Sequence, residues 1–155
     1  MKSGQQVRIR PYQVGDAATV SAIIRTTMRV SNSADYAPER LQPLIDYFSP
    51  AKVDQINETR TCLVAEVSGV LVATAGLEDD ELVTFFVLPE WQGRGVGGAL
   101  LAELERAAQT QGITELKVDA SVTGAAFYAR HGYGRTGEIL DGTAGPQVSM
   151  RKRLI

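Results

Sequence analysis

At 155 residues, the chain is long enough to bury the core of one domain, and its net charge of −2 lacks the basic excess of a general nucleic-acid binder. The single cysteine, Cys62, excludes a disulfide within the chain, and its apolar surroundings indicate a buried, unreactive thiol. The first residues lack a signal-peptide core, and no apolar run reaches the length of a membrane span. No Cys/His cluster suggests a metal site. We therefore expect one domain over residues 1–155, located in the cytoplasm, with no nucleic-acid, membrane or metal partner.

Hydrophobic spacing and turn residues predict the elements of the first half of the chain. A strand over Val7–Arg10 precedes a helix over Ala17–Val30, for which Asp16 is the expected cap. Pro38 and Pro50 each open a further helix, because proline is tolerated at the first helical position. Three β-rich runs then follow in close succession and predict a meander. These runs are Thr61–Val67, Val70–Leu77 and Glu81–Leu88.

The second half of the chain alternates between helices and strands. Leucines at helical spacing predict a helix over Val96–Ala108, which Gly112 ends. The remaining predicted elements are a strand over Leu116–Val118, a helix over Ala125–Arg130, and strands over Tyr133–Leu140 and Gln147–Ile155 around the loop Asp141–Pro146. This order of elements predicts an α/β fold, in which a mixed sheet carries helices on its faces.

The segment Pro89–Gly98 joins the last run of the meander to the helix over Val96–Ala108 and contains four glycines. A turn of this kind directs backbone N–H groups outward at the positive end of a helix dipole, which is a geometry that binds phosphate. Glycines let a ligand approach the backbone closely because they have no Cβ atom. Arg94 would add a charged contact to a phosphate. The segment is therefore predicted to bind a phosphate-containing cofactor.

The same glycines allow a second interpretation. Gly93, Gly95 and Gly98 match the G-x-G-x-x-G fingerprint of dinucleotide-binding proteins, and Asp119 follows at about the distance of a ribose-binding acid. That fingerprint normally lies in the first βα turn of its fold, whereas several predicted elements precede this loop. Pro89-Glu90-Trp91-Gln92 also separates the strand from the glycines, where the fingerprint needs a tight turn. A nicotinamide-dependent oxidoreductase nevertheless stays open as an alternative.

Two segments together resemble the GNAT family of N-acetyltransferases. Gln92–Gly97 fits the family loop Gln/Arg-x-x-Gly-x-Gly/Ala, and it follows Val87-Leu88-Pro89, where the family has Val-x-Pro. Phe127–Tyr133 fits the family helix Phe-Tyr-x-x-x-Gly-Phe/Tyr. The order of predicted elements from Val7 to the C-terminus fits as well, and Val118–Ser121 is most similar to small bacterial members.

The resemblance implies both a fold and a reaction. The fold would be a mixed, mostly antiparallel sheet of about six to seven strands with helices on both faces. The reaction would move the acetyl group of acetyl-CoA to a primary amine of a small molecule or peptide, by direct attack in a ternary complex. A non-catalytic acyl-CoA-binding protein would share these features and stays open, and a homodimer is a possible assembly.

The resemblance also implies where the cofactor lies. Backbone groups of Phe85, Phe86 and Val87 would contact the pantetheine arm and the acetyl carbonyl. The residues that would cradle the pyrophosphate are Gln92, Gly93, Arg94, Gly95, Val96, Gly97 and Gly98. A side chain added at Gly95 or Gly97 is accordingly expected to block the close approach of the ligand. Tyr128 would lie near the thioester sulfur.

Acetyl transfer needs a proton for the leaving thiolate and an acceptor for the amine proton. Tyr128 is the candidate acid, and Phe127 beside it is the expected core residue because its ring has no polar tip. Glu81 is the candidate base, although its acidic neighbourhood also suits a solvated turn and water could accept the proton. Ser121 stands where many family members have an asparagine, so no confident role follows for it.

No motif identifies the acceptor amine. Its specificity would come from residues 17–48 and from the loop Asp141–Pro146, and the acidic stretch near Glu81 favours a cationic amine. Asp35, Tyr36 and Tyr47 are candidate residues of the acceptor pocket, although Tyr47 fits a helix face equally well.

Overall fold

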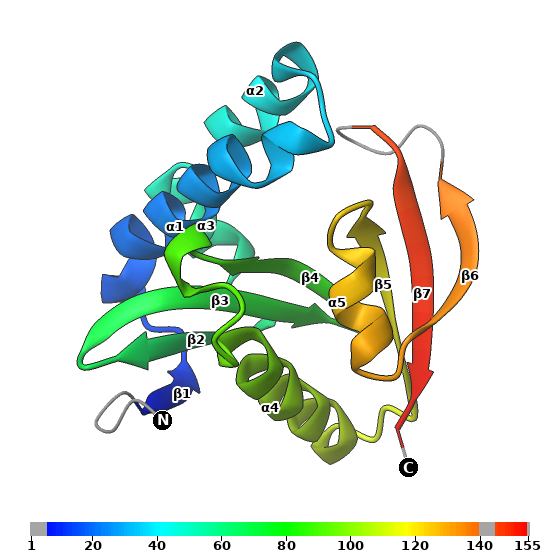
Figure 1. Cartoon of the computed structure of the whole chain (residues 1–155). Coiled ribbons are helices and arrows are strands. Elements are labelled where there is room, and N and C mark those ends of the chain that lie inside the picture. The colour runs from blue at the N-terminus through cyan, green and yellow to red at the C-terminus, as the bar shows by residue number, and fades with distance from the viewer. Residues whose placement is uncertain (1–5, 140–144, 155) are drawn as a thin grey trace.

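The strands of the computed structural model, which describes residues 6–139 and 145–154, form one sheet. Its order is β1-β2-β3-β4-β5-β7-β6, and every neighbouring pair is antiparallel except β4 and β5. The strands are β1 (Val7–Pro11), β2 (Thr61–Val67), β3 (Val70–Glu78), β4 (Glu81–Val87), β5 (Glu115–Ser121), β6 (Gly134–Ile139) and β7 (Gln147–Arg153). The predicted fold class, a mostly antiparallel mixed sheet with helices on both faces, is confirmed (Figure 1).

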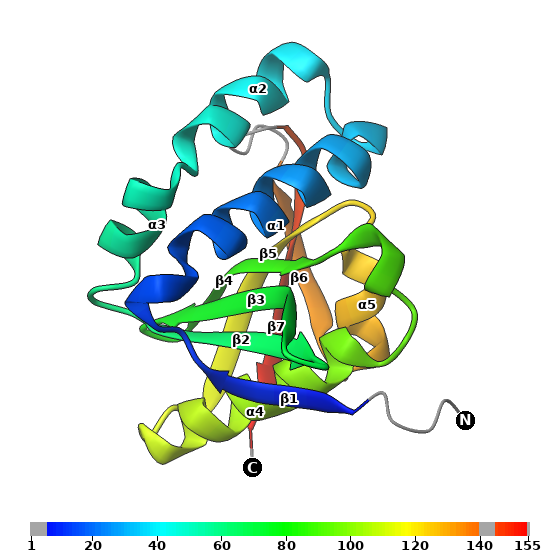
Figure 2. The ribbon, with the colours of Figure 1, turned by 90° about the vertical axis from the view of Figure 1, so that its left-hand side faces the viewer.

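Helices cover the two faces of the sheet unequally, as Figures 1 and 2 show. One face carries α1 (Ala17–Val30), α2 (Pro38–Tyr47) and α3 (Pro50–Ile56), which share a core with β2 and β3. The other face carries α4 (Val96–Thr110) and α5 (Ala125–Arg130), whose apolar sides meet the central strands in a larger core. Short 3₁₀ turns at Val14–Asp16, Asn32–Ala34 and Pro89–Trp91 complete the connections.

Local chemistry explains where these helices begin, with one correction. Pro50 opens α3 as predicted, and the Ser49 Oγ atom caps it by accepting the Lys52 N–H at 3.2 Å. Asp16 precedes α1 but does not cap it. Its carboxylate instead accepts the Gln13 N–H at 2.8 Å and pairs with the Arg10 guanidinium at 2.9 Å. The predicted cap therefore ties β1 to the start of α1.

The parallel pair of β4 and β5 is joined only at its beginning. The register pairs Glu81 with Lys117, and the Lys117 N–H donates to the Asp80 carbonyl at 3.0 Å. Beyond this point the two strands diverge (Figure 1). The far part of β4 therefore has an edge that pairs with no strand among the described residues, and its outward backbone groups face a gap.

A bulge in β4 decides which residues face that gap. Thr84 and Phe85 together oppose one residue of β3, since Val83 pairs with Gly76 and Phe86 with Thr74. Thr84 has a φ of 45°, an uncommon value for a β-branched residue. Because of this extra residue, each residue after the bulge faces the side of the strand opposite to the one it would face in a regular strand.

Candidate active site

The glycine loop of the site has the backbone conformation expected of a phosphate cradle. Gly93 and Gly95 have φ values of 75° and 86°, which glycine adopts without strain. The first bond of α4 runs from the Ala99 N–H to the Gly95 carbonyl at 3.1 Å, so the earlier N–H groups of the helix have no intrahelical acceptor. A Cβ atom built on Gly93 or Gly95 would meet no described atom within 4 Å. The loop therefore presents open backbone donors, which suit a pyrophosphate.

The last two glycines of the loop have a different structural role. A Cβ atom on Gly97 would lie 3.0 Å from the ring of Phe127, and one on Gly98 would lie 3.0 Å from the Nε2 atom of His131. Both glycines thus let α5 pack closely on the first turn of α4. A side chain at Gly97 would therefore meet the Phe127 ring, and its effect on a ligand stays a prediction.

The side chains at the start of the loop brace it against its surroundings. The Arg94 guanidinium lies over the Trp91 ring, 4.7 Å from its centroid. The Gln92 amide Nε2 donates to the Val87 carbonyl at 2.9 Å and to the Ser31 Oγ atom at 3.1 Å. Gln92 thereby joins the loop to the end of β4 and to the residue that follows α1. The Gln92 N–H also donates within the loop, to the Pro89 carbonyl at 3.3 Å.

The edge of β4 that faces the gap presents the backbone of Val87. The Leu88 N–H donates to the Val72 carbonyl at 2.9 Å, so alternation directs the backbone of Phe86 toward β3 and that of Val87 away from it. By the same alternation, Phe85 also faces the gap. The backbone contact of Phe86 with a cofactor stays a prediction, and the direction of its backbone favours Phe85 and Val87 for that contact. The Phe86 ring packs toward the core beneath α1, whereas Phe85 and Val87 pack toward α4 and α5.

Tyr128 is the buried member of the aromatic pair in α5, which reverses the expected roles of the two residues. It is 7% exposed, and its ring lies 5.9 Å from that of Phe85 and 5.6 Å from that of Tyr133. Phe127 is only partly buried, because it lies over Gly97 at the surface of α4. Among the described residues the Tyr128 hydroxyl has no hydrogen-bond partner. Burial raises the pKa of Tyr128, so the hydroxyl keeps its proton at neutral pH.

Glu81 lies where β4 and β5 separate, in a polar hollow of about 390 Å³. Lys117, Asp119, Ser149 and Arg151 are among the residues that line this hollow. Burial, followed by the negative charge of Asp119, raises the pKa of Glu81, while Lys117 opposes the shift. At about 3.3 Å per residue, Glu81 lies roughly 13 Å along the strand from Phe85. A proton passing from the gap to this carboxylate would need bridging water.

Comparison with known proteins identifies the family to which the chain belongs. Residues 32–154 match the acetyltransferase (GNAT) domain. The chain belongs to the GNAT acetyltransferases. It is 28% identical over 127 residues to the uncharacterized N-acetyltransferase YafP of Escherichia coli K12, covering 82% of this chain and 81% of that protein.

Solved structures with the same fold agree with this assignment. A GCN5-related N-acetyltransferase from Rhodopseudomonas palustris is 29% identical and has a TM-score of 0.88, with 99% of both chains covered. The PaiA N-acetyltransferase of Thermoplasma acidophilum, solved in complex with coenzyme A, is 22% identical with a TM-score of 0.81, covering 96% of this chain and 99% of that one. The predicted family, fold and enzyme class, an acetyl-CoA-dependent acetyltransferase, are thereby confirmed.

At the asparagine position of many GNAT members, Ser121 has a structural role in this chain. Its Oγ atom accepts the Gly124 N–H at 3.0 Å, immediately before α5 begins. The hydroxyl thereby fixes the turn that connects β5 to the helix carrying Tyr128. A serine hydroxyl that accepts an N–H a few residues further along the chain is a common turn motif, and it gives Ser121 the role that the family resemblance alone did not.

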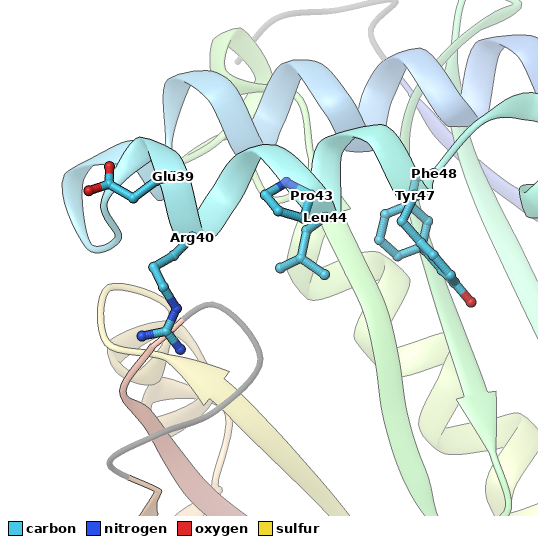
Figure 3. Close-up of a pocket in the computed structure, with 6 residues that line it drawn as sticks. All are labelled: Glu39, Arg40, Pro43, Leu44, Tyr47 and Phe48. Atoms are coloured by element: carbon cyan, nitrogen blue, oxygen red, sulfur yellow. The ribbon is translucent and has the colours of Figure 1, made fainter.

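The three candidate residues of the acceptor pocket lie in different settings. Asp35 accepts from Thr123, at 3.1 Å from its N–H and 2.7 Å from its Oγ atom. Tyr36 is buried, and its hydroxyl donates to the Pro146 carbonyl at 2.8 Å. Tyr47 is 47% exposed and lines a hollow of about 590 Å³ along α2 (Figure 3). Residues 141–144 of the predicted specificity loop lie outside the described residues.

The hollow along α2 has a mainly apolar floor. Pro43, Leu44, Tyr47 and Phe48 line it, with Glu39 and Arg40 at the end where the helix begins (Figure 3). Within residues 6–139 and 145–154, no helix has the length and apolar character needed to span a membrane, and no group of His, Cys, Asp and Glu side chains could hold a metal ion.

Proposed function

We propose that the chain is an N-acetyltransferase that moves the acetyl group of acetyl-CoA to a primary amine by direct attack in a ternary complex. The observation that carries this proposal is the open edge of β4 beside the glycine loop. The loop supplies donors for a pyrophosphate, and the gap beside Val87 supplies a strand edge along which an extended pantetheine arm can lie. The PaiA N-acetyltransferase, which has the same fold, was solved in complex with coenzyme A, and this supports coenzyme A as the group that the fold binds.

The backbone at the gap fits the electrostatic part of the reaction. The Val87 carbonyl already accepts the Gln92 amide, which leaves the Val87 N–H as the outward donor at this position. A fixed N–H aimed at the acetyl carbonyl would stabilise the negative charge that develops on its oxygen, a contribution of roughly 3–4 kcal/mol in comparable sites. Phe85 lies two residues earlier on the same edge. The strand edge would thus provide the oxyanion stabilisation without a side chain.

Two side chains are proposed for the proton transfers. Tyr128 lies beside Phe85, and its hydroxyl has no hydrogen-bond partner within residues 6–139 and 145–154, which suits donation of a proton or hydrogen bond to the leaving thiolate. Glu81 lies in the polar hollow, and its raised pKa brings it closer to the range of a general base acting near neutral pH. Its distance from the gap makes water the carrier of the amine proton.

Release of free CoA thiol tests the proposal. Acetyl-CoA is supplied to the protein with a panel of amines, polyamines, amino acids, aminoglycosides and peptide N-termini. At least one amine should stimulate thiol release in proportion to enzyme, with the acetylated amine detected by mass spectrometry. Tight binding of acetyl-CoA without amine-dependent release would instead indicate a non-catalytic acyl-CoA-binding protein. Binding of NAD in preference to CoA would instead favour a nicotinamide-dependent oxidoreductase.

A further inference from the structure

The bulge in β4 needs an external cause, because its own sequence does not favour it. Thr84 adopts a φ of 45° although a branched Cβ disfavours the left-handed region, so this conformation is strained. The bulge sets the phase of the following residues, so it decides that Val87 rather than Phe86 faces the gap. The contacts that hold Thr84 in this conformation therefore control which N–H the site presents.

Arg60, which immediately precedes β2, reaches across the sheet to the bulge. Its Nη1 atom lies 3.5 Å from the Thr84 Oγ1 atom, and its Nη2 atom donates to Glu78 at 3.1 Å. The side chain is only 12% exposed, whereas that of Glu78 is 51% exposed. The guanidinium therefore spans the end of β3 and the strained residue of β4 from a largely buried position.

Gly76 provides the path along which this side chain crosses β3. A Cβ atom on Gly76 would lie 3.2 Å from the Arg60 Cδ atom and 3.3 Å from the Thr84 Oγ1 atom. Its φ does not require glycine, so the close approach of Arg60 and β4 explains the residue better than backbone freedom does. The absence of a side chain at Gly76 thus leaves the space in which Arg60 reaches the bulge at Thr84.

The placement of Arg60 has an energetic cost that fold stability alone does not explain. Its Nε atom is buried and makes no hydrogen bond within the described part of the chain. An unsatisfied buried donor destabilises the fold, and an ion pair with a half-exposed glutamate offsets little of that free-energy cost. A long guanidinium nevertheless fits this position because it can contact Glu78 and Thr84 together.

We propose that Arg60 is a positioning residue for acetyl transfer, which holds the Thr84 bulge so that the Val87 N–H faces the acetyl carbonyl. Arg60 acts through the backbone and does not touch the cofactor. The inference rests on the proposed function and adds to it the residue that fixes the oxyanion donor. It predicts a larger effect on turnover than on cofactor affinity, because the proposed pyrophosphate contacts lie on the glycine loop and not on β4.

Arg60→Met tests the inference, since methionine keeps the apolar stem and removes the charge and the donors. We expect kcat to fall at least tenfold, while the affinity for acetyl-CoA, measured by calorimetry, changes less than threefold. Adding Thr84→Gly should restore most of kcat, because glycine adopts a positive φ without strain. Arg8→Met is the matched control, since Arg8 forms an exposed ion pair with Glu66 on β2 and should leave kcat unchanged. If Arg60→Met does not fold, Arg60→Lys replaces it with the same expectations, because an ammonium cannot span Glu78 and Thr84 together.

Two results would overturn the inference. One is an Arg60→Met protein with the kcat of the parent. The other is a loss of kcat that Thr84→Gly does not restore and that follows the fall in melting temperature, which would make Arg60 a residue of fold stability only. The amide NMR signals of Phe85 and Val87 provide a readout independent of turnover, and unchanged signals in Arg60→Met would also contradict the inference. If the parent releases no thiol with any amine, the proposed function fails, while these signals still report on the bulge.

Discussion

The Tyr128 hydroxyl is the residue-scale feature on which the proposed proton transfer depends. The Tyr128 ring contacts the rings of Phe85, Phe127 and Tyr133, and its hydroxyl has no hydrogen-bond partner within the described residues. The residue is 7% exposed, but its oxygen is not among the fully buried side-chain atoms that lack a partner, so an atom of a bound cofactor can reach it.

Tyr128→Phe separates a catalytic role of this hydroxyl from a purely structural one. General acid catalysis contributes roughly 10²–10⁴-fold, and a thiolate leaves readily, so we expect kcat to fall by about 10–1000-fold. The melting temperature and the acetyl-CoA affinity should stay nearly unchanged, because no described hydrogen bond is lost and the ring remains. Turnover and thermal unfolding are measured on one preparation. Full activity in this variant would end the general-acid assignment.

The pH dependence of turnover tests Glu81. Burial and the charge of Asp119 raise the pKa of Glu81, so the base form is lost as the pH falls through that raised pKa. Asp119→Asn removes part of the cause and should move the acidic limb of kcat/KM to lower pH, whereas Glu81→Gln should lower kcat/KM and abolish that limb. The raised pKa means that the carboxylate destabilises the fold above its unfolded-state pKa, so Glu81→Gln should not lower the melting temperature at neutral pH. A Glu81→Gln profile like that of the parent would leave proton removal to water.

At the scale of elements, the close packing of α5 on the first turn of α4 connects the acid to the phosphate loop. Gly97 contacts the Phe127 ring, and Phe127 is the neighbour of Tyr128 in α5. A shift of either helix would therefore move the loop relative to the Tyr128 hydroxyl. A side chain at Gly97 is therefore expected to affect both the packing of the two helices and the phosphate loop.

Gly97→Val should disturb both the fold and the loop. Overpacking against Phe127 is expected to destabilise the protein by about 1–3 kcal/mol, and displacement of α4 should weaken acetyl-CoA binding by about tenfold. Phe127→Ala makes room for the added side chain, so a double-mutant cycle in urea should show a favourable coupling of at least about 0.5 kcal/mol. Gly15→Ala, which meets no atom within 4 Å, is the control. Strictly additive effects would show that Gly97 and Phe127 are not coupled.

Element boundaries followed from the sequence where punctuating residues mark them. Pro38 and Pro50 open their helices as expected, and Gly112 follows α4 closely. The strand predicted over Leu116–Val118 is longer, spanning Glu115–Ser121, because its alternate residues face a polar hollow and weaken the apolar signal.

The candidate site was predictable only in part. The glycine loop was evident because several glycines at a strand–helix junction are typical of phosphate-binding turns. Neighbouring aromatic residues do not show which of them is the more buried, so the greater burial of Tyr128 than of Phe127 was not predicted. The bulge in β4 could not be predicted, because the contacts that hold it come from Arg60, which is distant in sequence. The one sequence feature that relates to the bulge is Gly76, a glycine inside the neighbouring strand β3.

At the scale of the whole molecule, the sheet consists of two parts that separate between β4 and β5. The strands β4 and β5 pair only at Glu81, and further hydrogen bonds between the two parts of the fold come from segments outside these strands. Tyr36, which precedes α2, bonds to Pro146 before β7, and Asp35 bonds to Thr123 before α5. These contacts hold the residues between α1 and α2 against the C-terminal part of the fold.

Tyr36→Phe should show how much one of these ties contributes. A buried hydrogen bond contributes about 1 kcal/mol, which for a domain of this size lowers the melting temperature by about 2–4 °C. Tyr47→Phe is the control, because that side chain is 47% exposed and its ring contact with Lys52 does not involve the hydroxyl. Differential scanning calorimetry compares the two proteins. An equal response of both would show that the bond to Pro146 carries no stability.

A crystal structure with acetyl-CoA tests the central claim most directly. We predict that the pyrophosphate lies on the backbone N–H groups of residues 93–98, that the pantetheine arm follows the edge of β4, and that the acetyl carbonyl accepts from the Val87 N–H. The thioester sulfur should lie within hydrogen-bond distance of the Tyr128 hydroxyl. A cofactor bound away from the gap between β4 and β5, or one whose carbonyl and sulfur contact neither Val87 nor Tyr128, would contradict the account.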